Sequence, residues 1–167
     1  MIRIIGIDPG LSNTGYGLIQ VSGNRYEHLE HGVITTSSKT NTGERLKKIY
    51  ESLKEIVKTF APDEAGIESL YFAKNISSAL PVAQAKGVVL MTFALKGIPA
   101  KEYSPLAIKQ SIVGRGRAEK QQVQELTRML LGLTEIPGPD HAADALAAAI
   151  CHYHQSAVMK VVEGERP

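Results

Sequence analysis

The 167-residue sequence has a single cysteine, Cys151, and therefore cannot form an intramolecular disulfide bond. A lone thiol is typical of proteins that work in the reducing cytoplasm. The sequence also lacks an apolar run approaching the roughly 20 residues that a membrane-spanning helix needs. Its short apolar start carries Arg3, which argues against a secretory signal peptide. These absences together predict a soluble protein of the cytoplasm.

A strong excess of charge is also missing. The 19 Lys and Arg residues nearly balance the 17 Asp and Glu residues, so the formal net charge is only +2. This mildly basic balance does not identify a binding partner by itself. Because the chain has no internal repeat and no low-complexity linker, we expect a single domain over residues 1–157 and a flexible C-terminal tail over residues 158–167.

Strands and helices alternate along the predicted structure. Strands are expected near residues 3–8, 14–21, 26–36, 64–69 and 99–104. Helices are expected near residues 46–60, 76–96, 118–131 and 140–155, with a short one after Ser104-Pro105. Asn41 and Glu44 could form the capping box of the first helix. Three meandering strands followed by alternating helices and strands favour a mixed α/β sheet with helices on both faces.

Two carboxylates stand where predicted strands end. Asp8 closes the apolar run that starts at Ile2, and Glu68 closes a short strand in which Ala65 and Ile67 share one face. A simpler explanation for Asp8 is a tight turn, since Asp-Pro-Gly is a favourable turn sequence. However, two such residues in one sheet are less common, because a buried carboxylate needs a partner.

A third acidic group lies on the last predicted helix. His141 and Asp144 are three residues apart and share a helix face. Six alanines between residues 142 and 149 would let this helix approach a sheet closely. Asp140 is more simply explained as an N-cap or as a first-turn charge favoured by the helix dipole.

Four motifs together carry a family resemblance. They are IIGIDPGLSNTGYG, GIESLYFAKN, AEKQQVQELTRMLL and DHAADALAAAI. In this order and spacing the chain resembles the RuvC family of Holliday-junction endonucleases, within the ribonuclease H-like superfamily. The resemblance implies a mixed five-stranded ribonuclease H-like sheet with helices on both faces. It also implies a homodimer that resolves four-way DNA junctions by paired symmetric nicks, in recombination and repair, with a branch-migration helicase complex of the RuvA and RuvB type.

The resemblance also implies specific site residues. Its metal and catalytic positions fall on Asp8, Glu68, His141 and Asp144, although many members carry Asp where this chain has His141. A pair of Mg²⁺ ions roughly 4 Å apart is the expected cofactor for phosphodiester hydrolysis, and Mn²⁺ is expected to substitute. Asp8 would be shared by both ions.

DNA contacts are indicated by weaker signals. Tyr71 matches a stacking aromatic of the family, and Lys109 and Lys120 match two lysines thought to contact phosphates. The basic turn 114–117 exposes backbone N–H groups beside two guanidiniums. The basic residues that could line a phosphate-binding surface are Lys74, Lys86, Lys109, Arg115, Arg117 and Lys120. The apolar helix over residues 82–95 is the expected dimer seam, with Gly87 allowing close approach.

Three alternatives stay open at this level. Actin-like and sugar-kinase ATPases open with a similar D-x-G-x-x-x-T-G pattern, but they use two such domains, and residues 140–144 would then have no role. The chain could instead be a junction-binding module without catalysis. It could also be a related ribonuclease H-like nuclease that acts on RNA.

Overall fold

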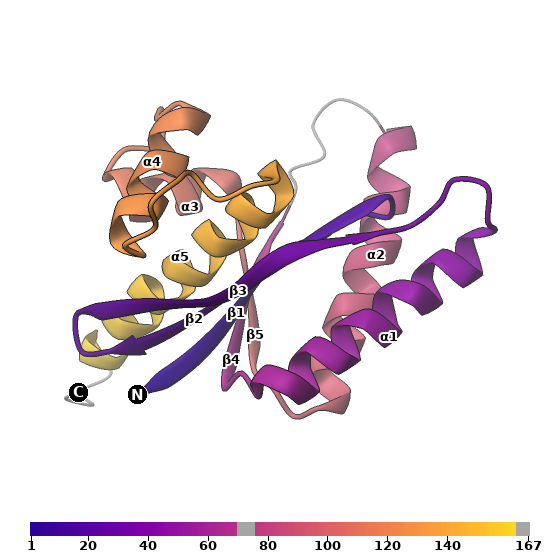
Figure 1. Ribbon diagram of the computed structural model, residues 1–167, viewed down its shortest axis with the longest axis horizontal. Coiled ribbons are helices and arrows are strands. Elements are labelled where there is room, and N and C mark those ends of the chain that lie inside the picture. Colours follow the sequence, from indigo (N-terminus) through magenta and orange to yellow (C-terminus); the bar gives the residue numbers. More distant parts are fainter. Residues whose placement is uncertain (70–75, 163–167) are drawn as a thin grey trace.

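A computed structural model describes residues 1–69 and 76–162 and shows a five-stranded sheet between two layers of helices (Figure 1). The strands are β1 (Ile2–Asp8), β2 (Asn13–Ser22), β3 (Arg25–Thr35), β4 (Glu64–Glu68) and β5 (Ala100–Tyr103). The helices are α1 (Thr42–Phe60), α2 (Ile76–Leu95), α3 (Pro105–Val113), α4 (Lys120–Leu130) and α5 (Asp140–Val162). The predicted α/β class with helices on both faces is confirmed.

The sheet is mixed, and its strand order is β3-β2-β1-β4-β5. β1 runs antiparallel to β2 and parallel to β4, with Ile7 beside Ile67 in the register. Because β1 and β4 are parallel neighbours, their carboxyl ends lie at the same edge of the sheet. This edge brings Asp8 and Glu68 together.

The apolar run of β1 is continuous because both of its faces are buried. Ile5 and Ile7 pack toward α1 and α2, where Leu53 and Phe93 belong to the same core. Ile4 packs on the opposite face, in a second core that includes residues of α5. In Figure 1, α1 and α2 cover one face of the sheet and α5 covers the other, with α3 and α4 on the same side as α5 and packed against it.

The start of α1 agrees with the sequence prediction, whereas the end of α5 differs from it. α1 begins at Thr42, and the Asn41 side chain accepts a hydrogen bond from the Glu44 backbone N–H at 3.0 Å, as expected for the predicted cap. α5 continues to Val162, beyond the predicted end near Gln155 and beyond residue 157. No glycine or proline occurs between Gln155 and Val162, so the sequence of this stretch contains no strong helix breaker.

Glycines of the sheet allow α5 to lie almost directly on the strands. A Cβ atom added to Gly6 would overlap the carbonyl oxygen of Ala145, and one added to Gly15 would overlap that of His141. The alanines of α5 complete this close approach, because Ala142, Ala145 and their neighbours are buried. The contact fixes where the first turns of α5 stand relative to the ends of β1 and β2.

The substitution Gly15→Ala is therefore expected to destabilise the fold. The added methyl group would push the start of α5 away from β2, and such overpacking typically costs about 1–3 kcal/mol. Urea denaturation should show a lower midpoint with an unchanged slope. Gly43→Ala, where the methyl group would meet only the Asn41 side chain at 3.3 Å, is the control and should hold or gain stability. Equal stability for Gly15→Ala and wild type would show that this contact does not fix α5.

Among the described residues, no helix is long and apolar enough to cross a membrane.

Candidate metal centre

Three carboxylates from distant parts of the chain meet at the sheet edge. Asp8 ends β1, Glu68 ends β4, and Asp144 lies one turn into α5. One oxygen from each side chain can be chosen so that all three atoms lie within 4.8 Å of one another. Asp8 is only 7% exposed, whereas Glu68 and Asp144 are partly buried. The group fits the oxygen donors that a hard divalent cation prefers.

The electrostatics of this group favour a bound cation. Burial raises the pKa of Glu68 to about 8, and the negative charges of Asp8 and Asp144 act in the same direction. Burial also raises the pKa of Asp8 above its ordinary value, although the hydrogen bond from His141 opposes the shift. Ionising neighbouring carboxyl groups costs electrostatic free energy, and a cation bound between them lowers that cost.

Lys120 supplies part of that positive charge. Its Nζ lies 3.0 Å from Asp144 Oδ2 and 3.3 Å from Asp140 Oδ2. Burial opposes the ammonium charge, yet the hydrogen bonds and attraction of Asp144 and Asp140 raise the pKa of Lys120. Lys120 therefore holds the start of α4 against the start of α5 at the rim of the site.

Three of the four predicted ligand positions form the carboxylate group, and the fourth, His141, lies next to it. His141 lies at the site, where its Nδ1–H donates to Asp8 Oδ2 at 2.6 Å, but it is outside the three-carboxylate group. Asp140 is exposed in the first turn of α5 and accepts from the Gln124 amide at 3.2 Å, as a first-turn charge would. The structure therefore brings His141 and Asp144 to the carboxylates, and it leaves Asp140 at the exposed start of α5.

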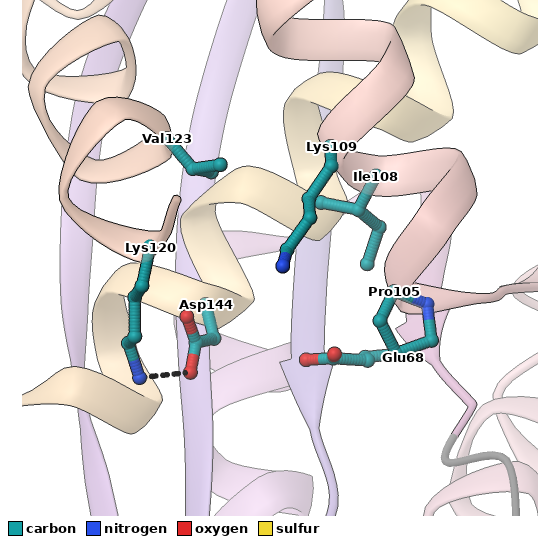
Figure 2. A pocket seen from close by; sticks show the side chains of 7 residues that line it. All are labelled: Glu68, Pro105, Ile108, Lys109, Lys120, Val123 and Asp144. Carbon is teal, nitrogen blue, oxygen red and sulfur yellow. Dashed lines mark hydrogen bonds and ion pairs between the residues drawn. The ribbon is translucent and has the colours of Figure 1, made fainter. Parts of the chain in front are cut away.

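A small pocket of about 170 Å³ opens beside the carboxylates (Figure 2). Figure 2 shows Glu68 and Asp144 facing each other from β4 and α5, with the Lys109 ammonium pointing toward the space between them. The other residues that line it are Pro105, Ile108, Lys120 and Val123. The pocket thus combines acidic groups that can hold a cation with lysines that can contact an anion.

The remaining predicted DNA contacts lie in different surroundings. Arg115 and Arg117 are exposed in the turn between α3 and α4. Lys86 is paired with Glu102 at 2.8 Å. Tyr71 and Lys74 lie outside the described residues.

Sequence reasoning missed one charged residue beside the site. Arg45 lies on α1 and lines a second pocket together with His141. Its only signal in the sequence is a basic residue in the first turns of an amphipathic helix, where such residues usually face solvent. Its position depends on a tertiary contact with the β1–β2 turn, which no local pattern reveals.

Comparisons of the sequence with known proteins identify one family. The family model for crossover junction endodeoxyribonuclease RuvC matches residues 4–152. RuvC of Treponema denticola is 55% identical over 147 residues, covering 88% of this chain and 83% of that protein. RuvC of Thermotoga petrophila is 48% identical over 164 residues, covering 98% of this chain and 99% of that protein.

A solved structure extends this agreement to three dimensions. Thermus thermophilus RuvC in complex with Holliday junction substrate superposes with a TM-score of 0.91 at 32% identity. The superposition covers 95% of this chain and 97% of that chain. The chain belongs to the RuvC family of crossover junction endodeoxyribonucleases.

Proposed function

We propose that this protein is a metal-dependent endonuclease that resolves four-way (Holliday) DNA junctions by paired symmetric nicks, in recombination and DNA repair. The observation that carries the proposal is the group formed by Asp8, Glu68 and Asp144 at the sheet edge of a RuvC-family fold. The relatives are named crossover junction endodeoxyribonucleases, and Thermus thermophilus RuvC has been solved with a Holliday junction substrate.

The carboxylates would hold two Mg²⁺ ions. Asp8 would be the ligand shared by both, and Glu68 and Asp144 would each hold one, because Mg²⁺ prefers carboxylate, water and phosphate oxygens. Bound in this way, the ions would stabilise charge on the phosphate and lower the pKa of the attacking water. Mn²⁺ would substitute, since its ligand preferences are similar.

The chain's own side chains would orient these ligands. His141 Nδ1–H donates to Asp8 and fixes the direction of its carboxylate, while Lys120 holds Asp144. The Nε2 atom of His141 has no partner among the described residues, so it is available as a fourth ligand or as a phosphate contact. Such orienting contacts commonly matter tenfold to a hundredfold for metal affinity or activity.

Basic residues of α3, α4 and the turn between them would bind the DNA backbone. Lys109 is the best placed, because it lines the pocket between Glu68 and Asp144 (Figure 2). Lys120, Arg115 and Arg117 would add phosphate contacts around it. Tyr71 and Lys74 follow Glu68 in the chain, and we retain Tyr71 as a base-stacking residue and Lys74 as a phosphate contact.

A homodimer would place two such sites on one four-way junction. Support comes from α2, whose exposed side carries Leu80, Met91 and Leu95 at 63%, 48% and 66% exposure. Gly87 is exposed on the same helix and has no side chain that would keep a second helix away. We further propose that the dimer acts in the cytoplasm beside a branch-migration helicase complex of the RuvA and RuvB type.

A substrate panel tests the function. With Mg²⁺, wild-type protein should nick a synthetic four-way junction at symmetric positions in two strands and leave a linear duplex of the same sequence intact. An RNA–DNA hybrid should also stay intact. Preference for the hybrid would favour a ribonuclease, and tight junction binding without nicks would favour a non-catalytic binding module.

Substitutions of His141 and of its neighbour Asp140 should have different effects on nicking activity. His141→Ala should lose most activity, because Asp8 loses its hydrogen-bond donor and the site loses an imidazole. His141→Asp should retain much of it, since a carboxylate restores the ligand commoner in the family. Asp140→Asn is the control and should have a mild effect, because Asn preserves an acceptor for Gln124. Nicking rates of the variants are compared on one junction. If Asp140→Asn were inactive while His141→Ala still cut the junction, the fourth ligand position would belong to Asp140.

A further inference from the structure

A second pocket is lined by His141, the residue that contacts Asp8 of the carboxylate group. It has a volume of about 310 Å³, and its walls come from four separate parts of the chain. The lining residues that matter here are Gly10, Ser12, Asn13, Arg45, Val82 and His141. Because His141 also donates to Asp8, one residue connects this pocket to the carboxylate group.

Arg45 is held in a fixed direction in this pocket. Its Nε–H donates to Thr36 Oγ1 at 2.9 Å, and its Nη2 donates to Ser12 Oγ at 2.9 Å. Thr36 in turn donates its hydroxyl hydrogen to the Leu11 carbonyl. The guanidinium is therefore fastened to the β1–β2 turn, the same turn that follows Asp8.

The partners of Arg45 are neutral, so its charge is not cancelled. No carboxylate is present among the described residues that line the pocket, and no described carboxylate forms an ion pair with Arg45. A guanidinium carries five N–H donors, and the two hydroxyls use two of them. The rest can bind an oxyanion through a planar, two-pronged contact of the kind that arginine forms with phosphate.

We propose that this pocket binds a phosphate of the cleaved DNA strand next to the scissile one, and that Arg45 is a positioning residue for cleavage. The inference rests on the proposed function, because it needs a DNA strand lying across the carboxylates. The strand would then be held at two points, by cations at the acidic group and by the fixed guanidinium of the pocket that His141 also lines. Holding the neighbouring phosphate limits how far the scissile phosphate can move from the attacking water.

Two variants separate the charge of Arg45 from its shape. Arg45→Gln removes the charge but keeps an amide donor for the hydroxyls, and Arg45→Lys keeps the charge but loses the planar contact. Lys47→Gln is the matched control, because Lys47 is exposed on the same helix and its loss changes the net charge equally. Thermal unfolding of each variant establishes that the protein is folded.

Loss of the contact between Arg45 and the phosphate should change both DNA binding and cleavage. For Arg45→Gln, the slope of log affinity against log salt should decrease by about 0.9, the value for one duplex phosphate contact. The single-turnover nicking rate at saturating protein should fall tenfold to a hundredfold, while Arg45→Lys should fall less. Lys47→Gln should match wild type in both measurements.

A scan with neutral phosphates gives the decisive result. Junctions carrying one methylphosphonate at successive positions flanking the cut should slow wild-type cleavage at one position next to it. Arg45→Gln should be insensitive at that same position, because the contact is already gone; if this variant does not fold, Arg45→Lys takes its place with a reduced sensitivity. If variant and wild type were equally sensitive to the methylphosphonate at every position, Arg45 would only stabilise the β1–β2 turn and the proposal would be overturned. Failure of the proposed function is a different result, in which wild-type protein nicks no junction at all.

Discussion

Asp8→Asn should abolish junction nicking while leaving junction binding nearly intact. The substitution removes one negative charge from the most buried carboxylate of the group and keeps its size. As the ligand proposed to be shared by both ions, Asp8 should matter more than a residue that only orients a ligand, whose loss typically costs tenfold to a hundredfold. Binding should persist because affinity for DNA comes mainly from phosphate contacts.

The measurement compares single-turnover nicking with electrophoretic binding on the same junction. Asp63→Asn is a suitable control, because Asp63 is exposed in the loop before β4 and its acceptor for the Arg3 backbone N–H survives in Asn. The control should nick at the wild-type rate. Normal nicking by Asp8→Asn would remove Asp8 from the metal site.

Glu68→Gln should stabilise the metal-free protein at alkaline pH. Burial and the charges of Asp8 and Asp144 raise the pKa of Glu68 from 4.5 to about 8. Between these two values the folded protein binds more protons than the unfolded chain, so its free energy of unfolding falls as pH rises. The loss is complete above about pH 8 and amounts to at most about 5 kcal/mol, at 1.36 kcal/mol per pKa unit.

Urea denaturation in EDTA at pH 4.5 and pH 8.5 measures this effect. Wild type should lose stability between the two pH values, and Glu68→Gln should lose distinctly less. Glu51→Gln, at an exposed position of α1, should follow wild type. Added Mg²⁺ should restore wild-type stability at pH 8.5 without helping Glu68→Gln to the same extent. If the free energy of unfolding changed with pH in the same way for wild type and Glu68→Gln, the pKa of Glu68 would not be raised in the folded protein.

Each of the three carboxylates that meet in the structure is marked by a local pattern in the sequence. Asp8 and Glu68 follow apolar strands, and Asp144 lies in an alanine-rich stretch whose close packing is readable from residue size. The strand order then brings the first two together, since parallel neighbours end at one edge. His141 was placed at the site by resemblance, but its hydrogen bond to Asp8 required the structure.

Other features depend on contacts that no local pattern encodes. Lys86 was expected on a phosphate-binding surface, yet Glu102 of β5 lies beside it and pairs with it. Arg45 was overlooked because the hydroxyls that hold it belong to Ser12, in the β1–β2 turn, and to Thr36, directly after β3. In both cases the partner side chains are separated in the sequence and come close only in the folded chain.

Junction nicking should be measured with Mg²⁺ and with EDTA, beside junction binding in the same samples. Wild-type protein should bind the four-way junction in both conditions and make paired symmetric nicks only with Mg²⁺. Nicking in EDTA would contradict a metal centre at Asp8, Glu68 and Asp144. Binding without nicks at any Mg²⁺ concentration would contradict the endonuclease activity itself.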